Sequence, residues 1–371
     1  MSAAVATAPS SGKVTDLLAL REQETGKPVE PAGNEITKRT LERMKRSNES
    51  RKKRGQFGGL TLAPLGNVSG SDWVRFYQMN HAWGGIDHGC HLIGGDTNMG
   101  KSSVARMIAY DIMRFNKNVH VRFYTLDDAE DYFFDCFVAQ AAKVPINAVN
   151  KPEGFINKPE EYYKKRDYER MVERGHEMYQ RFLSGEFAEK FSYVGTASMQ
   201  TTDWTVIEDD IKRTRQMLPR DVELVVFIDN FHDIEMPGYE NDNNRKTEEV
   251  ANRCGQLCEK LQITMIGTVE LKKNNQRRPT LDDIFGSRKW KYKARTVILV
   301  YSEVGAQKPN PRLYYERPDK PNEQSSVLEV HFVKSKGNEF KGRLFYEQLT
   351  EMGLMLEVPK DRAAQYALSI S

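Results

Sequence analysis

A short glycine-rich run constrains this chain more than any other feature of its sequence. The run comprises Gly95, Asp96, Thr97, Asn98, Met99, Gly100, Lys101, Ser102 and Ser103. Its spacing, G-x-x-x-x-G-K-S, lets the backbone fold tightly so that N–H groups point inward at phosphate oxygens. The lysine then reaches the β- and γ-phosphates, and the serine after it contributes a hydroxyl to a hydrated Mg²⁺ ion. We therefore expect these residues to bind a nucleoside triphosphate with Mg²⁺.

The flanking residues predict that this run joins a strand to a helix. Residues 91–93 can form a short buried strand, and Val104, Ile108, Ile112 and Phe115 recur at helical spacing. The phosphates would then lie at the N-terminus of a helix, where the helix dipole favours anions. A chance glycine-rich turn, the alternative, would not explain the strand and the helix on either side.

Apolar runs alternate with helix-like segments along the rest of the chain. The runs are residues 120–126, 191–194, 224–228, 264–269 and 296–300. A long charged segment, 158–190, is helix-like. Unbroken apolar strands separated by helices indicate a sheet covered on both faces, hence an α/β fold with a doubly wound, mostly parallel sheet. Two later runs, 327–333 and 344–346, are expected to close the sheet at an antiparallel edge.

Length and composition are those of a globular chain without an export signal. With 371 residues, 39% of them hydrophobic and 29% charged, it has room for one large α/β domain and an appendage. No apolar run is long enough to cross a bilayer, and the first residues do not resemble a signal peptide. Four cysteines do not suggest a disulfide framework, and Cys254 and Cys258, one helical turn apart, favour helix packing over a zinc site. We expect a cytoplasmic protein.

The charge is uneven near the N-terminus, although the net charge is only +3. Residues 1–33, with few large apolar side chains, are expected to be a disordered tail. Residues 34–84 are expected to be a basic linker helix and an irregular lead-in, because nine lysines and arginines lie between residues 38 and 54. Contact with nucleic acid, docking on a neighbouring subunit and a solvated helix or tail all remain open for this segment.

A second nucleotide motif lies at the end of the apolar run 224–228, which continues into Asp229. A carboxylate at such a strand end, downstream of a phosphate-binding loop, commonly holds the water shell of Mg²⁺. The signal is weak by itself and becomes specific together with Lys101 and Ser102. We expect Ser102 and Asp229 to hold the metal.

Taken together, these motifs resemble those of the DnaB-type replicative helicases, whose motor is a RecA-like domain. The resemblance covers residues 85–350, and its motifs occur in the family's order. They are residues 95–102, 125–128 with 139–145, 227–231, 244–250, 268–271, 278–284 and 333–338. The resemblance implies a RecA-like P-loop motor over residues 85–371. It also implies ATP hydrolysis between the subunits of a ring, usually a homohexamer, which translocates on single-stranded DNA in bacteria or phage-infected cells. A helicase loader and a primase are further partners that the family implies.

The resemblance also implies roles for residues beyond the phosphate-binding loop. Asp127 occupies the position of the family's catalytic glutamate, and Glu270 replaces its phosphate-sensing glutamine. Lys334 and Lys336 fall where a neighbouring subunit inserts a lysine and an arginine finger. The residues expected to contact DNA are Arg245, Lys246, Arg288, Lys289, Lys291 and Lys293. Around Trp290, alternating cations and aromatic residues could follow phosphates and stack on bases; the alternative is a solvated loop with Trp290 in the core.

The chain departs from the family at several of these positions. Asp127 is one methylene shorter than glutamate, so Asp128 or Glu130 could substitute for it, and Lys336 lacks the planar fork of arginine. Residues 1–84 are too short and too polar to hold the family's primase-interacting domain. A non-processive RecA-like DNA-dependent ATPase in repair, recombination or helicase loading is therefore the alternative to a helicase motor. A small-molecule kinase is disfavoured, because nothing resembles an acceptor-binding lid.

Overall fold

The computed structural model describes residue 42 and residues 59–64, 76–157, 164–239, 241–272, 277–285, 288–317 and 320–370. Packing divides the chain into two units, residues 1–55 and 56–371. Of the first unit the structure describes Glu42 alone, which is helical. The expected tail and the rest of the expected basic helix therefore lie outside the described residues. The sheet and the helices around it belong to the second unit.

Ten strands of the second unit form one sheet. They are β1 (Gly89–Gly94), β2 (Val119–Thr125), β3 (Phe191–Gly195), β4 (Glu223–Asp229), β5 (Thr264–Val269), β6 (Thr296–Tyr301), β7 (Tyr314–Arg317), β8 (Lys320–Ser335), β9 (Arg343–Leu349) and β10 (Leu354–Glu357). Their order is β10-β9-β8-β6-β1-β5-β4-β2-β3, with β7 paired to β8. The strands from β6 to β3 run parallel, whereas β7, β8, β9 and β10 pair in antiparallel fashion. The predicted mostly parallel sheet with an antiparallel edge is confirmed.

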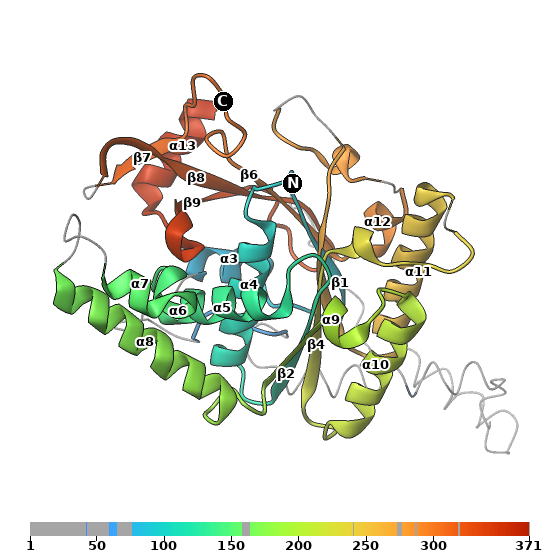
Figure 1. Ribbon diagram of the computed structural model, residues 1–371. Helices are drawn as coiled ribbons and strands as arrows, with labels where there is room; N and C mark the ends of the chain where they lie inside the picture. The colour runs from blue at the N-terminus through green and yellow to red at the C-terminus, as the bar shows by residue number, and fades with distance from the viewer. Residues whose placement is uncertain are drawn as a thin grey trace, which may run out of the picture. The chain divides into compact units, whose positions relative to one another are not determined.

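Helices cover both faces of this sheet (Figure 1). They are α3 (Tyr77–Trp83), α4 (Lys101–Phe115), α5 (Glu130–Ala142), α6 (Asn147–Asn150), α7 (Pro152–Ile156), α8 (Lys165–Leu183), α9 (Thr196–Met199), α10 (Trp204–Met217), α11 (Asn243–Leu261), α12 (Arg288–Lys293) and α13 (Lys360–Ile370), with 3-10 turns at Phe231–Asp233, Leu281–Asp283 and Thr350–Met352. α4, α5 and α8 contribute to one apolar layer, and α10 and α11 to the other. Among the described residues, no helix is long and apolar enough to cross a membrane.

Alternate side chains of the central strands enter the two layers. Phe123 of β2 and Phe227 of β4 stack with ring centroids 5.2 Å apart in the layer that contains α4. Their chain neighbours Tyr124 and Val226 pack in the opposite layer with α10 and α11. Side chains of a strand point to opposite faces in turn, so a sheet covered on both faces needs the unbroken apolar runs that the sequence contains.

The lead-in to β1 packs with the sheet and is held by two late segments of the chain. Leu60 and Trp83 are buried in the same apolar layer as α4. Glu357 at the end of β10 accepts a hydrogen bond of 2.6 Å from the backbone N–H of Gln78 in the first turn of α3. The side-chain amide of Asn338 donates to carbonyl oxygens at the other end of that helix. Both ends of α3 are therefore fixed by residues distant in sequence.

Candidate functional site

The glycine-rich run forms the loop between β1 and α4. Gly100 has a φ angle of 84° and Asn98 one of 62°, so the chain passes twice through the left-handed region before α4. Glycine adopts this region without strain, and asparagine tolerates it better than most residues. A Cβ atom at Gly95 would lie 2.6 Å from Cγ2 of Val300. The left-handed backbone at Gly100 and the lack of space for a side chain at Gly95 therefore explain the two glycines of the motif.

The start of α4 offers donors to an anion. In the described part of the chain, no side chain caps the helix N-terminus at Gly100, so its first N–H groups are available to a phosphate. The Lys101 ammonium group crosses the loop and donates to the carbonyl oxygen of Asp96 at 3.0 Å. Burial lowers the pKa of Lys101, and the nearby carboxylates of Asp229 and Glu270 oppose that effect. The lysine thus lies among carboxylates that carry the opposite charge.

Asp229 is the last residue of β4 and is buried. The hydroxyl of Thr268, on the adjacent strand β5, donates to one carboxylate oxygen of Asp229 at 2.5 Å. On the other side of β4, Thr125 of β2 pairs in register with Asp229, which brings the residues after β2 to the same edge of the sheet. Asp127 follows two residues later and is exposed. The two carboxylates therefore come from neighbouring parallel strands, at their carboxyl ends.

The two substitutes considered for Asp127 are engaged elsewhere. Asp128 lies 3.6 Å from the guanidinium of the buried Arg106, and burial raises the pKa of Asp128. Glu130 accepts hydrogen bonds from the backbone N–H groups of Gly195 and Ser198 and from the Ser198 hydroxyl, and the last of these lowers its pKa most. Asp127 makes no hydrogen bond or ion pair within the described residues, so it is the carboxylate of this segment that is free to meet a ligand.

Glu270 follows β5, and His232 fixes its backbone. The Glu270 N–H donates to Nδ1 of His232 at 3.1 Å, so the ring proton must reside on Nε2. Nε2 faces the carbonyl oxygen of Phe285 at 3.5 Å, and the Phe285 N–H in turn donates to the carbonyl of Glu270. Burial lowers the pKa of His232, which keeps the ring neutral. His232 therefore connects the end of β5 to the segment that leads into α12.

Asp233, next to His232, faces the same group of carboxylates. Burial, and after it the negative charges of Asp127, Glu270 and Asp229, raise the pKa of Asp233 from 3.8 to about 6. Sequence reasoning missed Asp233, His232 and Thr268. The available signal was their closeness in sequence to the ends of β4 and β5, where side chains gather at the ligand-binding edge of a parallel sheet.

Lys334 and Lys336 lie at the end of β8 and in the turn after it. Their ammonium groups donate to carbonyl oxygens of α12 in the same chain: Lys334 to Lys291, and Lys336 to Tyr292 at 2.6 Å. Burial, together with the charge of Lys336, lowers the pKa of Lys334 to about 8. In this conformation both lysines are bound at the C-terminal end of the helix that was expected to contact DNA.

α12 carries only part of the expected DNA-contacting set on its surface. Trp290 is fully buried and packs on Phe231 with ring centroids 4.8 Å apart. The expectation that this tryptophan stacks on bases is therefore wrong, because the ring is buried between α12 and the 3-10 turn that follows β4. Tyr292 is 72% exposed. Lys289 and Lys293 are exposed, Lys291 pairs with Asp282, and the side chain of Arg288 is outside the described residues.

The other expected DNA-contacting residues lie at the start of α11. Arg245 has a side chain that is 79% exposed, and its guanidinium lies 3.4 Å from the carboxylate of Asp242, which caps the helix. Lys246 is half-buried and donates to the carbonyl oxygen of His232 at 3.1 Å. Arg245 is thus exposed and accessible to a ligand, whereas Lys246 stabilises the turn that follows Asp229.

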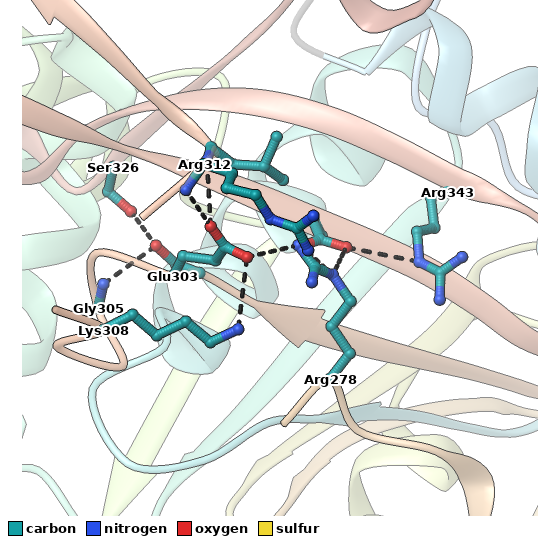
Figure 2. A network of polar contacts seen from close by, with 10 residues as sticks. Arg278, Glu303, Gly305, Lys308, Arg312, Ser326 and Arg343 are labelled. Atoms are coloured by element: carbon teal, nitrogen blue, oxygen red, sulfur yellow. Dashed lines mark hydrogen bonds and ion pairs between the residues drawn. The ribbon is translucent and has the colours of Figure 1, made fainter. Parts of the chain in front are cut away.

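The expected motif at residues 278–284 is anchored by a buried network of ion pairs (Figure 2). Arg278 donates to both oxygens of Glu329 and, at 2.9 Å, to Glu303. The carboxylates of Glu303 and Glu329 are 1% and 2% exposed. Lys308 and Arg343 add positive charge at 3.4 Å from Glu303 and Glu329, respectively. Arg278 therefore fixes the segment before α12 to β8 and to the turn that follows β6.

This fold and this site define a class of protein. A phosphate-binding loop follows the central strand β1, and a buried aspartate ends β4 two strands away in a doubly wound sheet. These are the features of a P-loop nucleotide-binding protein with a RecA-like fold.

Comparison with known proteins gives the family. The family model of the DnaB-like helicase C-terminal domain matches residues 74–338, and the chain therefore belongs to this family. One solved structure, described as an ATPase domain, is similar with a TM-score of 0.64 and 12% identity, covering 87% of this chain and 98% of that one. A second, described as "The Structure Of A DnaB-Like Replicative Helicase And Its Interactions With Primase", has a TM-score of 0.62 and 13% identity, covering 94% of this chain and 75% of that one. No curated protein sequence matches the chain.

Proposed function

We propose that this chain is the ATP-hydrolysing motor of a DNA helicase, which works as a ring, usually a hexamer, on single-stranded DNA during replication. The observation that carries the proposal is the arrangement around the start of α4. Lys101 follows β1, Asp229 ends β4 and Asp127 follows β2, so all three lie at the carboxyl edge of the parallel strands. Ligands of open α/β sheets bind at this edge. Membership of the DnaB-like family supports DNA as the polymer along which the motor moves.

The residues at this edge fit a Mg²⁺ ion. Thr268 holds one oxygen of the buried Asp229, and the second oxygen has no hydrogen bond among the described residues. Ser102, in the first turn of α4, supplies a hydroxyl. One carboxylate and one hydroxyl, completed by water and phosphate oxygens, match the ligands that Mg²⁺ uses in such sites. When bound, the metal offsets negative charge on the phosphates.

The remaining groups would position the reacting atoms. Lys101 would leave the carbonyl of Asp96 and bind the β- and γ-phosphates, where its charge stabilises the transferring phosphoryl group. Asp127 would orient the attacking water and accept its proton. Glu270 would lie near the γ-phosphate, with its backbone held by His232. On the DNA side, Arg245, Lys289 and Lys293 would contact phosphates along one strand.

The experiment that tests this proposal is an ATP hydrolysis assay with and without single-stranded DNA. Lys101→Ala should abolish hydrolysis, because no other lysine or arginine of the described residues is placed in the loop to reach the β- and γ-phosphates. Lys117→Ala, an exposed lysine beyond the end of α4, is the matched control and should hydrolyse normally. Hydrolysis by Lys101→Ala within a few-fold of the unaltered protein would refute the assignment, provided that circular dichroism shows both variants folded.

A non-processive RecA-like ATPase in repair, recombination or helicase loading is the second candidate. The observation that favours it is the position of Lys334 and Lys336, which bind α12 of their own chain instead of extending from the surface. Electron micrographs with ATP and single-stranded DNA separate the two candidates. Rings on DNA support the helicase, and monomers under the same conditions support the second candidate.

A further inference from the structure

The C-terminal end of α12 is held by two ammonium groups from outside the helix. Lys334 donates to the carbonyl of Lys291, and Lys336 donates to that of Tyr292. The last carbonyl oxygens of a helix have no partner within the helix, and the negative end of the helix dipole favours cations there. The two lysines therefore cap a helix of six residues that is too short to be stable by itself.

The two lysines differ in how firmly they are placed. Lys334 belongs to β8, where it pairs with Val297 of β6, and its side chain is half-buried. Lys336 comes after the end of β8 and is exposed. Its backbone is fixed independently of its side chain, because its N–H donates to the carbonyl of Arg295 at 2.9 Å. Of the two side chains, the exposed one of Lys336 is therefore freer to leave α12 than the half-buried one of Lys334.

We propose that the carbonyl end of α12 and the phosphates of a nucleotide bound by a neighbouring subunit compete for the ammonium group of Lys336. This inference rests on the proposed function and on the role that the family resemblance implies for Lys336, which is to reach a nucleotide bound by the neighbouring subunit. One ammonium group lies in one place at a time, so engagement of the phosphate removes a cap from α12. Lys334 stays in place and keeps the helix attached to β8.

The competition would couple the neighbouring subunit's nucleotide site to the DNA-binding surface of α12. α12 displays Lys289 and Lys293, the cations assigned to DNA, and Trp290 fixes its other side in the core. Loss of the Lys336 cap would destabilise the C-terminal turn of α12 and change the positions of Lys289 and Lys293 at the surface. Because such coupling is reciprocal for binding free energies, whatever holds α12 in its capped form must weaken the contact of Lys336 with the phosphate.

Hydrogen exchange of the α12 amides tests this inference. The comparison uses the full-length chain as unaltered protein, Lys336→Met and Lys341→Ala, each with and without a non-hydrolysable ATP analogue and Mg²⁺. Methionine keeps the length of the lysine chain and removes the ammonium group, and Lys341 is an exposed lysine of the following turn that serves as the control. Assembly and nucleotide binding are measured in the same samples by mass and by analogue retention.

The expected result has two parts. Without nucleotide, the α12 amides of Lys336→Met should exchange about two- to fivefold faster than those of the unaltered protein, because one helix-end cation is lost. With the analogue, the unaltered protein and Lys341→Ala should reach the same faster exchange, while Lys336→Met should not change further. Binding and assembly without any change in α12 exchange would overturn the competition and leave the proposed function standing. Absence of binding or assembly would overturn both.

Discussion

At the scale of single residues, the site depends on which carboxylate is free. Three acidic side chains lie within the five residues that follow β2, and two of them have partners: Asp128 pairs with Arg106, and Glu130 accepts hydrogen bonds from the amides before and within α9. Asp127 remains exposed at the edge of the sheet. The aspartate side chain is shorter than that of glutamate, so it extends less far toward a water molecule. Placement errors of about 1 Å can reduce rates by on the order of 10²-fold.

Asp127→Asn should bind nucleotide as the unaltered protein does and lose hydrolysis by about 10²- to 10⁴-fold, because the amide cannot accept the proton of the attacking water. Glu130→Gln should retain hydrolysis, since its oxygens bind backbone amides away from the ligand. Single-turnover ATP hydrolysis with a parallel nucleotide-binding assay measures both effects. Normal hydrolysis by Asp127→Asn together with its loss in Glu130→Gln would show that the second carboxylate is the functional one.

Two substitutions of His232 test whether its hydrogen bond to the Glu270 N–H is needed for hydrolysis. His232→Asn keeps an oxygen acceptor near the position of Nδ1, whereas His232→Leu removes the acceptor and leaves the Glu270 N–H unpaired. We expect His232→Leu to lose more of the DNA-stimulated ATPase rate than His232→Asn. Because burial lowers the pKa of His232 below its usual 6.5, this residue should add no pH dependence to the rate above that value. Equal losses in both variants would mean that the hydrogen bond to Glu270 is irrelevant.

Residues that belong to a local sequence motif could be predicted from the sequence. Residues that act through contacts between distant segments could not. Lys101 and Asp229 stand where their local motifs placed them, at the start of α4 and the end of β4. Thr268 contacts Asp229 only because β4 and β5 lie side by side. Trp290 looked accessible among its charged neighbours, yet it is buried against Phe231, a contact that no local pattern reveals.

At the scale of elements, Arg278 joins the segment before α12 to β8 and to the turn after β6 (Figure 2). Arg278→Met should destabilise the fold by about 3–5 kcal/mol, because it leaves two buried carboxylates without their central cation. Arg312→Met is the control, since only the backbone N–H of Arg312 contacts Glu303. Urea unfolding measures both. A loss of less than about 1 kcal/mol for Arg278→Met would mean that Lys308 and Arg343 suffice.

The contact between β10 and α3 should depend on pH. Burial raises the pKa of Glu357 from 4.5 to about 7, against the opposing hydrogen bonds from the start of α3. A raised pKa means that the folded state holds the proton more tightly than the unfolded state. The stabilisation from Glu357 is therefore fully present below pH 4.5 and is lost as the pH rises through about 7.

Glu357→Gln keeps an acceptor for the α3 amides and cannot ionise. Between about pH 5 and about pH 8, the unaltered protein should lose up to about 3 kcal/mol of stability relative to this variant. Urea unfolding of both proteins at the two pH values measures the difference, and the comparison cancels the similar contribution of Asp233, whose pKa is also raised. Parallel pH curves for the two proteins would show that Glu357 is ionised throughout.

At the scale of the whole molecule, most of the sheet could be predicted, including β8 and β9 at its antiparallel edge, but the short strands β7 and β10 could not. The central strands are unbroken apolar runs, so their number and parallel direction follow from burial on both faces. β7 and β10 have four residues each and are recognised only by their pairing with β8 and β9. α3 likewise depends on Glu357 and Asn338, which lie more than 250 residues further along the chain.

In the proposed helicase ring, ATP is hydrolysed between subunits, with Lys101 from one subunit and Lys336 from the next. Lys101→Ala and Lys336→Met should each be inactive alone in the presence of single-stranded DNA. Mixed in equal amounts, they should recover up to about a quarter of the unaltered activity, because that share of head-to-tail interfaces would pair an intact loop with an intact lysine. No recovery in the mixture, with a monomeric mass in the presence of ATP and DNA, would contradict the account.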